Sequence, residues 1–193
     1  MVRVSVVDAV TVMKKEDMRP MQSILVLLDE ASCRAMGIWI GEAEAAAIDR
    51  GLRQSTMPRP MTMNFIASIL QAIGATLEEV RIETLKDDIF YAVARIRNGD
   101  TMHEIDARPS DAIALAVVSG TPIFVADDIL EKCGVVLPEG KTLHRISVEA
   151  PAEQVAILPF SQQPAGARLV SEEEWPKGEY EKNFQRVLNI LMK

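Results

Sequence analysis

The chain has 193 residues with 28 acidic and 21 basic side chains, which give a formal net charge of −7 at pH 7. Its 48% hydrophobic and 25% charged residues are ordinary for a soluble globular protein, and its length predicts one core domain with an appendage. The acidic balance argues against a broad electropositive face that would hold nucleic acid without sequence preference. It remains compatible with a local basic site.

The cysteines and histidines show no metal-ligand spacing. Cys33 and Cys133 lie far apart, and the only histidines are His103 and His144. This pattern fits a reducing compartment and predicts that both thiols are small, buried apolar side chains. The N-terminus lacks the continuous apolar segment of a signal peptide, and no run approaches the roughly 20 apolar residues that span a membrane. We therefore expect a cytoplasmic protein.

The N-terminal part of the chain alternates predicted strands and helices. Alternating valines predict one opening strand or a pair of strands, and short apolar runs predict buried strands after it. Glu42 and Glu44 fall in the first turn of a predicted helix, where the helix dipole favours anions. Thr62 is the expected N-cap of the next helix and Gly74 its end. The predicted elements are strands over residues 2–12, 23–28 and 37–41 and helices over residues 42–52 and 62–73.

The middle of the chain predicts an antiparallel meander. Asn98-Gly99 between two strand-like segments is a strong hairpin signal, because both residues tolerate positive φ. On the third strand, the two-residue period places Glu104 and Asp106 on one face and His103 on the other. Strands are predicted over residues 79–85, 89–97 and 101–107, and further along the chain over residues 122–126 and 143–149, with a helix between these last two from residue 127 to 133.

These elements predict a chain of the α/β (mixed α+β) class. We expect a mixed sheet with a central antiparallel meander, packed helices and a C-terminal helical tail. The predicted organisation is a domain over residues 1–150, a linker over residues 151–170 and an amphipathic helix over residues 171–193. Such a tail packs either on its own domain or on a partner subunit.

A polar corner lies within residues 105–120, IDARPSDAIALAVVSG. The sequence predicts a strand end, a turn at the Arg-Pro dipeptide, and a helix with Ser110 as N-cap and Asp111 as its first residue. With Asp106 and Arg108 just before it, four polar side chains come together at the start of an apolar helix that must be covered. This arrangement suits a binding or catalytic site. It equally suits a well-capped corner in which Arg108 only pairs with Asp106.

Three segments together resemble a known family. GIWIGEAEAAAI, RPMT and IDARPSDAIALA occur in the order and at the spacing of the bifunctional nuclease family, a set of small bacterial and plant domains credited with cleaving DNA and RNA. The similarity covers roughly residues 2–140. It implies a mixed α/β domain, a nuclease acting on DNA or RNA, and a homo-oligomer, with a dimer as the expected state.

The resemblance also implies the site. On the nuclease hypothesis, carboxylates activate water or hold a divalent metal, Mg²⁺ or Mn²⁺, while arginines and hydroxyls bind the phosphate. No standard metal-ligand motif is present, so the metal rests on this inference alone. The catalytic candidates are Glu44, Asp106 and Asp111, and the substrate-binding candidates are Arg59, Thr62, Arg108 and Ser110.

One departure from the family keeps an alternative open. Where the family usually continues RPMT with a histidine and an aspartate, this chain has Met63 and Asn64. Activity is then weakened, altered or lost. The alternative is a non-catalytic oligomeric module that binds a nucleotide, a small anion or a protein partner through the same arginine-lined cleft. A third possibility is that the corner is purely structural and that the function resides in surfaces assembled by oligomerisation.

Overall fold

The computed structural model describes residues 1–13, 20–55, 57–143, 157–159 and 180–192. The strands are β1 (Val2–Met13), β2 (Pro20–Asp29), β3 (Arg34–Ile40), β4 (Ala75–Lys86), β5 (Ile89–Asn98), β6 (Thr101–Ala107), β7 (Ile123–Val125), β8 (Val135–Val136) and β9 (Ile157–Pro159). The helices are α1 (Glu42–Leu52), α2 (Thr62–Ala72), α3 (Pro109–Ser119), α4 (Asp127–Cys133) and α5 (Tyr180–Leu191).

The strands in these ranges form one mixed sheet. Its order is β6-β5-β4-β7-β1-β2-β3-β8, and β9 pairs with β1. Among these pairings only that of β4 with β7 is parallel, and β4, β5 and β6 form the expected antiparallel meander. The predicted α+β class with a mixed sheet is therefore confirmed. The opening valines form a single strand, β1.

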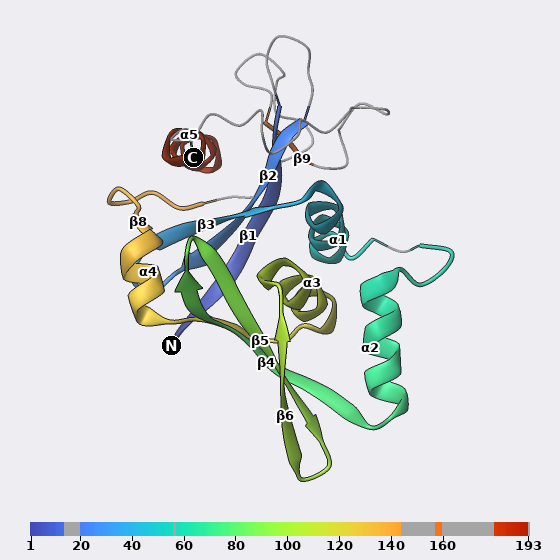
Figure 1. Ribbon diagram of the computed structural model, residues 1–193. Coiled ribbons are helices and arrows are strands. Elements are labelled where there is room, and N and C mark those ends of the chain that lie inside the picture. Colours follow the sequence, from blue (N-terminus) through green and yellow to red (C-terminus); the bar gives the residue numbers. More distant parts are fainter. Residues whose placement is uncertain (14–19, 56, 144–156, 160–179, 193) are drawn as a thin grey trace.

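Helices α1, α2 and α3 lie together on one face of this sheet (Figure 1). The middle helix, α3, packs against α1, α2, β4 and β5, and residues 112–116 are all buried. Its sequence has no polar residue over this stretch, so the expectation that it is covered on most sides is confirmed. Gly120 ends the helix with a φ of 67°, a conformation that costs glycine little.

Helix α5 packs on the opposite face of strands β1, β2 and β3 (Figure 1). The close approach depends on Gly37 of β3, where a Cβ would come within 2.7 Å of the Phe184 ring. The helical tail thus packs on its own sheet, one of the two possibilities predicted. This second core includes Val10, Ile24, Val26, Ala35, Val187, Leu188 and Leu191.

The C-terminal boundaries are only partly described. The predicted strand over residues 143–149 lies outside the described residues except for Leu143, which forms an isolated bridge with Met192. The predicted linker over residues 151–170 is also outside them, apart from residues 157–159 in β9. The division into domain, linker and tail stays a prediction. No helix within the described ranges has the length and apolar character needed to cross a membrane.

Several local predictions were wrong in detail. Ser110 and Thr62 do not cap their helices: Arg108 and Met61 occupy the N-cap positions, and neither uses a side-chain hydrogen bond. Pro109 explains the shift at α3, because its fixed φ suits the first helical position and it has no N–H to be capped. Cys33, expected to be buried, is exposed in the turn between β2 and β3.

The second hairpin is confirmed, with a different turn from the one expected. Asn98 still pairs with Thr101, so the two turn residues are Gly99 and Asp100. Of the residues in this turn, only Gly99 has a positive φ, 57°. A two-residue loop with glycine first matches the twist of the flanking strands.

Candidate functional site

A pocket of about 790 Å³ opens between α1, α2 and α3. Its volume falls in the range of small-molecule and cofactor sites, roughly 300 to 1,000 Å³. One side of α1 lines it with residues 43, 44, 47, 50 and 51, which recur at helical spacing, and Gln54 lines it from the turn that follows the helix. The N-terminal ends of α2 and α3 and the C-terminal end of α3 complete the wall.

Two glycines shape the α1 side of this pocket. A Cβ at Gly51 would lie 2.9 Å from Val117 Cγ1, so glycine allows α1 and α3 to approach closely. At Gly41, the N-cap of α1, a methyl group would overlap with the Glu44 carboxylate. Gly41 therefore leaves the space in which Glu44 turns toward its partner on α3.

That partner is Arg108, which binds two carboxylates from different helices. Its Nε and Nη2 contact Asp111 Oδ2 at 2.7 Å and Oδ1 at 3.2 Å, and its Nη2 contacts Glu44 Oε1 at 2.8 Å. The pairing of Arg108 with Asp106, considered from the sequence, is replaced by these contacts. Asp111 holds the guanidinium through two atoms, the geometry that fixes its orientation best.

The three side chains of this cluster differ in their exposure to solvent. The Glu44 side chain is 17% exposed, that of Asp111 is 39% exposed and that of Arg108 is 66% exposed. The hydrogen bond from Asp111, and then the charges of Asp111 and Glu44, raise the pKa of Arg108 above its already high value. Arg108 therefore stays cationic and keeps an open side toward solvent, as an anion-binding group requires.

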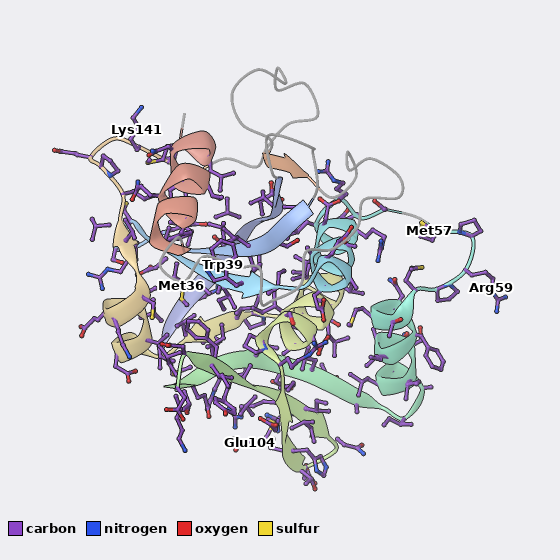
Figure 2. The ribbon with its side chains drawn as sticks, turned by 45° about the horizontal axis from the view of Figure 1, so that its top comes forward. Met36, Trp39, Met57, Arg59, Glu104 and Lys141 are labelled. Carbon is purple, nitrogen blue, oxygen red and sulfur yellow. The ribbon has the colours of Figure 1, made fainter. Side chains whose placement is uncertain are left out.

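Three further predicted positions lie at different places around the pocket. Thr62 lines it, as do Met63 and Asn64 at the positions where the family usually has histidine and aspartate. Ser110 is buried, with 6% of its surface exposed, and does not line the pocket. Figure 2 shows Arg59 on the loop between α1 and α2, away from the pocket wall.

Asp106 is not brought together with the other candidates. In the β5–β6 register Ala92 pairs with Ala107 and Val93 with Asp106. Ala92 is fully buried under the helices, so alternation sends Asp106 to the opposite face of the sheet. Its side chain is exposed there, beside Arg95 and Glu104 rather than Arg108. A catalytic role for Asp106 stays a prediction without geometric support.

Arg50 lines the pocket but was missed by the sequence reasoning. It lies on the same side of α1 as Ala43 and Ala47, and no ion pair involves it among the described residues. The sequence contained a signal for Arg50. It follows Glu44 by six residues, a spacing that places the two side chains at the two edges of one face of the helix. The prediction named Arg59 instead, because it precedes a proline at the start of a helix, as Arg108 does.

The acidic donors of the pocket are limited in number. Within the described ranges, no group of three or more histidine, cysteine, aspartate or glutamate side chains is placed to hold a metal ion. Glu44 and Asp111 supply two hard carboxylate ligands, and Mg²⁺ often takes only one or two, with water and phosphate oxygens completing its shell. The donor set fits such a cation if its other ligands come from water or substrate.

The chain is similar in sequence to known proteins. A model of the bifunctional nuclease domain matches residues 25–138, more than half of the chain. An uncharacterized protein of Mycobacterium tuberculosis is 37% identical over 118 residues, which cover 61% of this chain and 70% of the relative. Bifunctional nuclease 1 of Oryza sativa is 27% identical over 117 residues, 59% of this chain and 35% of the plant protein. The chain belongs to the bifunctional nuclease domain family.

Proposed function

We propose that this protein hydrolyses phosphodiester bonds of DNA or RNA in the pocket between α1, α2 and α3. The observation that carries the proposal is the cluster in which Arg108 lies between Glu44 and Asp111 at the pocket wall. It combines a fixed cation with two carboxylates, which are the groups that phosphodiester hydrolysis needs. Membership of the nuclease domain family supports the same reaction class.

Each residue of the cluster has a separate role in the proposed hydrolysis. Arg108 binds the non-bridging oxygens of the scissile phosphate and stabilises the negative charge that builds up on them. Glu44, the more sheltered carboxylate, takes a proton from a water molecule as the water oxygen bonds to phosphorus. The bond from phosphorus to the leaving oxygen breaks, and that oxygen takes a proton from solvent. Asp111 keeps the guanidinium in place, and Thr62, which lines the pocket, donates a hydrogen bond to the phosphate.

A divalent cation would be held by Glu44 and Asp111. Mg²⁺ or Mn²⁺ bound there would polarise the phosphate and lower the pKa of a bound water. Arg108 now occupies both carboxylates, so cation and guanidinium would compete for the same oxygens. Isothermal titration of wild type, Glu44→Gln and Asp111→Asn with Mn²⁺ tests this part. Binding that is equal in all three proteins would contradict it.

The main test is cleavage of single- and double-stranded DNA and RNA by purified protein, with Mg²⁺, Mn²⁺ or chelator. We expect Arg108→Ala and Glu44→Gln to lower the rate at least about 100-fold, the usual loss when one charge-stabilising or proton-transferring group is removed. Glu104→Gln, which changes an exposed carboxylate on the opposite face of the sheet, is the matched control and should keep wild-type activity, and Asp106→Asn tests the role predicted for Asp106 from the sequence. Equal activity in all variants would mean that a contaminant cleaves the substrate.

A non-catalytic binding module is the second candidate. It is favoured by Met63 and Asn64, which line the pocket where the family usually carries a histidine and an aspartate. In that case Arg108 would still bind a nucleotide or another small anion. Binding of a nucleoside monophosphate that is lost in Arg108→Ala, with no cleavage of any nucleic acid, would decide for this candidate. A cytoplasmic location is part of both proposals and is tested by fractionation of cells.

A further inference from the structure

Arg50 gives the pocket a second cationic group, separate from the Arg108 cluster. Its side chain is half-buried at the wall, on α1, and no acidic group pairs with it in the described part of the chain. Four other arginines within the described residues are paired: Arg53 with Asp49, Arg97 with Glu78, and both Arg81 and Arg95 with Glu79. An unpaired arginine inside a concave site of an acidic protein favours an anionic ligand there.

Arg50 lines the pocket from α1, and Arg108 lines it from the N-cap position of α3. Glu44, which holds Arg108, lies six residues before Arg50 on α1, roughly 9 Å along the helix axis and about 120° around it. Gly51, the next residue of α1, is packed against Val117 of α3. The two guanidinium groups are therefore placed to meet two anionic groups of one ligand rather than the same group.

We propose that the pocket binds a single-stranded nucleic acid through two of its phosphates, with Arg108 on one and Arg50 on the other. This inference rests on the proposed function and adds the form of the substrate and a second substrate-binding residue. Methionines and valines lie in the same wall, at Met57, Met61, Met63, Val117 and Val118, and offer apolar contacts to an unstacked base.

The charge distribution favours a single strand over a duplex. A duplex is held along its length by many Lys and Arg contacts to phosphates, and a net charge of −7 argues against a broad basic surface that could supply them. Two arginines inside a pocket of about 790 Å³ contact one short stretch of chain. A flexible single strand can enter that volume, whereas the bases of a duplex stay stacked and paired outside it.

The test measures affinity for a labelled single-stranded oligothymidylate in chelator, by fluorescence anisotropy over a range of salt concentrations. Each phosphate contact to a single strand contributes about 0.7 to the slope of log affinity against log salt. We expect Arg50→Ala to reduce that slope by about 0.7, Arg50→Lys to preserve it, and Lys86→Ala, which removes an exposed charge at the end of β4, to leave it unchanged.

A wild-type slope in Arg50→Ala would overturn the inference, as would a duplex of the same sequence that binds as tightly as the single strand. Cleavage is read separately in the same proteins. An Arg50-dependent slope without cleavage supports the inference and contradicts catalysis. Cleavage with an unchanged slope in Arg50→Ala supports the nuclease and removes Arg50 from it.

Discussion

Glu44 can reach Arg108 because residue 41 is glycine. The backbone of Gly41 is extended, with φ −72° and ψ 163°, so alanine could adopt it without strain. The obstacle to alanine is the Glu44 carboxylate, which occupies the place of a Cβ. The position of the Glu44 carboxylate thus depends on the absence of a Cβ at residue 41.

Gly41→Ala should therefore impair the site without unfolding the protein. The methyl group displaces the Glu44 carboxylate from Arg108, and we expect the cleavage rate, or anion affinity if the protein only binds, to fall roughly 10- to 100-fold, as small misplacements of catalytic groups do. Because the effect acts through Glu44, the double variant Gly41→Ala/Glu44→Gln should match Glu44→Gln alone. Additive losses in the double variant would show that Gly41 acts in another way.

A second residue-level prediction concerns the face of the sheet that carries Asp106. Glu79 accepts a hydrogen bond from Arg95 and pairs with Arg81. The bond from Arg95 is the main cause that lowers the pKa of Glu79, against the opposing effect of burial. A lowered pKa in the folded state stabilises the protein above the ordinary glutamate value, and this contribution is lost as the pH falls through the lowered pKa.

Glu79→Gln should therefore lower the free energy of unfolding at pH 7, and its difference from wild type should shrink in acid. Urea unfolding at pH 7, 4 and 2.5 measures this difference. Glu83→Gln is the control, because Glu83 makes one longer contact of 3.6 Å to Arg81 and should have a smaller effect. A Glu79→Gln difference that is the same at all three pH values would contradict the argument.

For single residues, the sequence was a better guide to which side chains would gather in one cluster than to which of them would pair with each other. The clustered residues Glu44, Arg108 and Asp111 were all candidates, but the pairing of Glu44 with Arg108 joins residues far apart in the chain and depends on how α1 packs on α3. Asp106 was correctly placed on the face of Glu104. Which face the helices cover is a tertiary property, so its distance from Arg108 could not be predicted from alternation alone.

Among the elements, α1 and α3 set the width of the pocket. Their contact depends on Gly51, whose missing side chain makes room for Val117. Gly51→Ala gains up to about 1 kcal/mol in helix propensity but overpacks the contact, which typically costs about 1 to 3 kcal/mol. We expect a net loss of stability and a wider pocket with lower activity.

Val117→Ala in the same chain should partly rescue Gly51→Ala, because it removes Val117 Cγ1, the atom nearest to the new Cβ, while Val118 Cγ2 at 3.3 Å stays. Thermal or urea unfolding of the two single variants and the double variant forms the test. We expect the double variant to be more stable than the sum of the single effects by on the order of 1 kcal/mol, a usual coupling for residues in contact. Strict additivity would mean that the helices do not meet at this point.

The sequence predicted elements well where a local signal determined them. The bounds of α1 agree with the prediction because Gly41 and the acidic first turn mark its start. The short strand β9 was not expected, since three residues carry no periodicity and this strand exists only through its pairing with β1. The tail helix was recognised from its apolar spacing. Its docking on β3 required Gly37, whose role is visible only once the two elements are in contact.

At the scale of the whole molecule, α2 presents a stripe of exposed apolar side chains. Phe65, Ile69 and Ile73 are 59%, 43% and 58% exposed, and with Met61 they recur every four residues along one side. The other side of α2 packs against the core, and residues 62–72 contain no charge. This stripe is a surface on which a second copy of an otherwise acidic chain can approach without charge repulsion.

The predicted homodimer should therefore form through α2, with the stripe of one copy packed against that of the other around a two-fold axis. A stable interface buries about 800 Å² per partner, more than one stripe supplies, so we expect reversible association measured at roughly 10 to 500 µM protein. Phe65→Asp and Ile69→Asp should each shift sedimentation equilibrium toward monomer. Ile89→Asp, which charges an equally exposed apolar residue on β5, should not. A wild-type chain that stays monomeric over this range, or an Ile89→Asp variant that dissociates like the other two, would remove α2 as the interface.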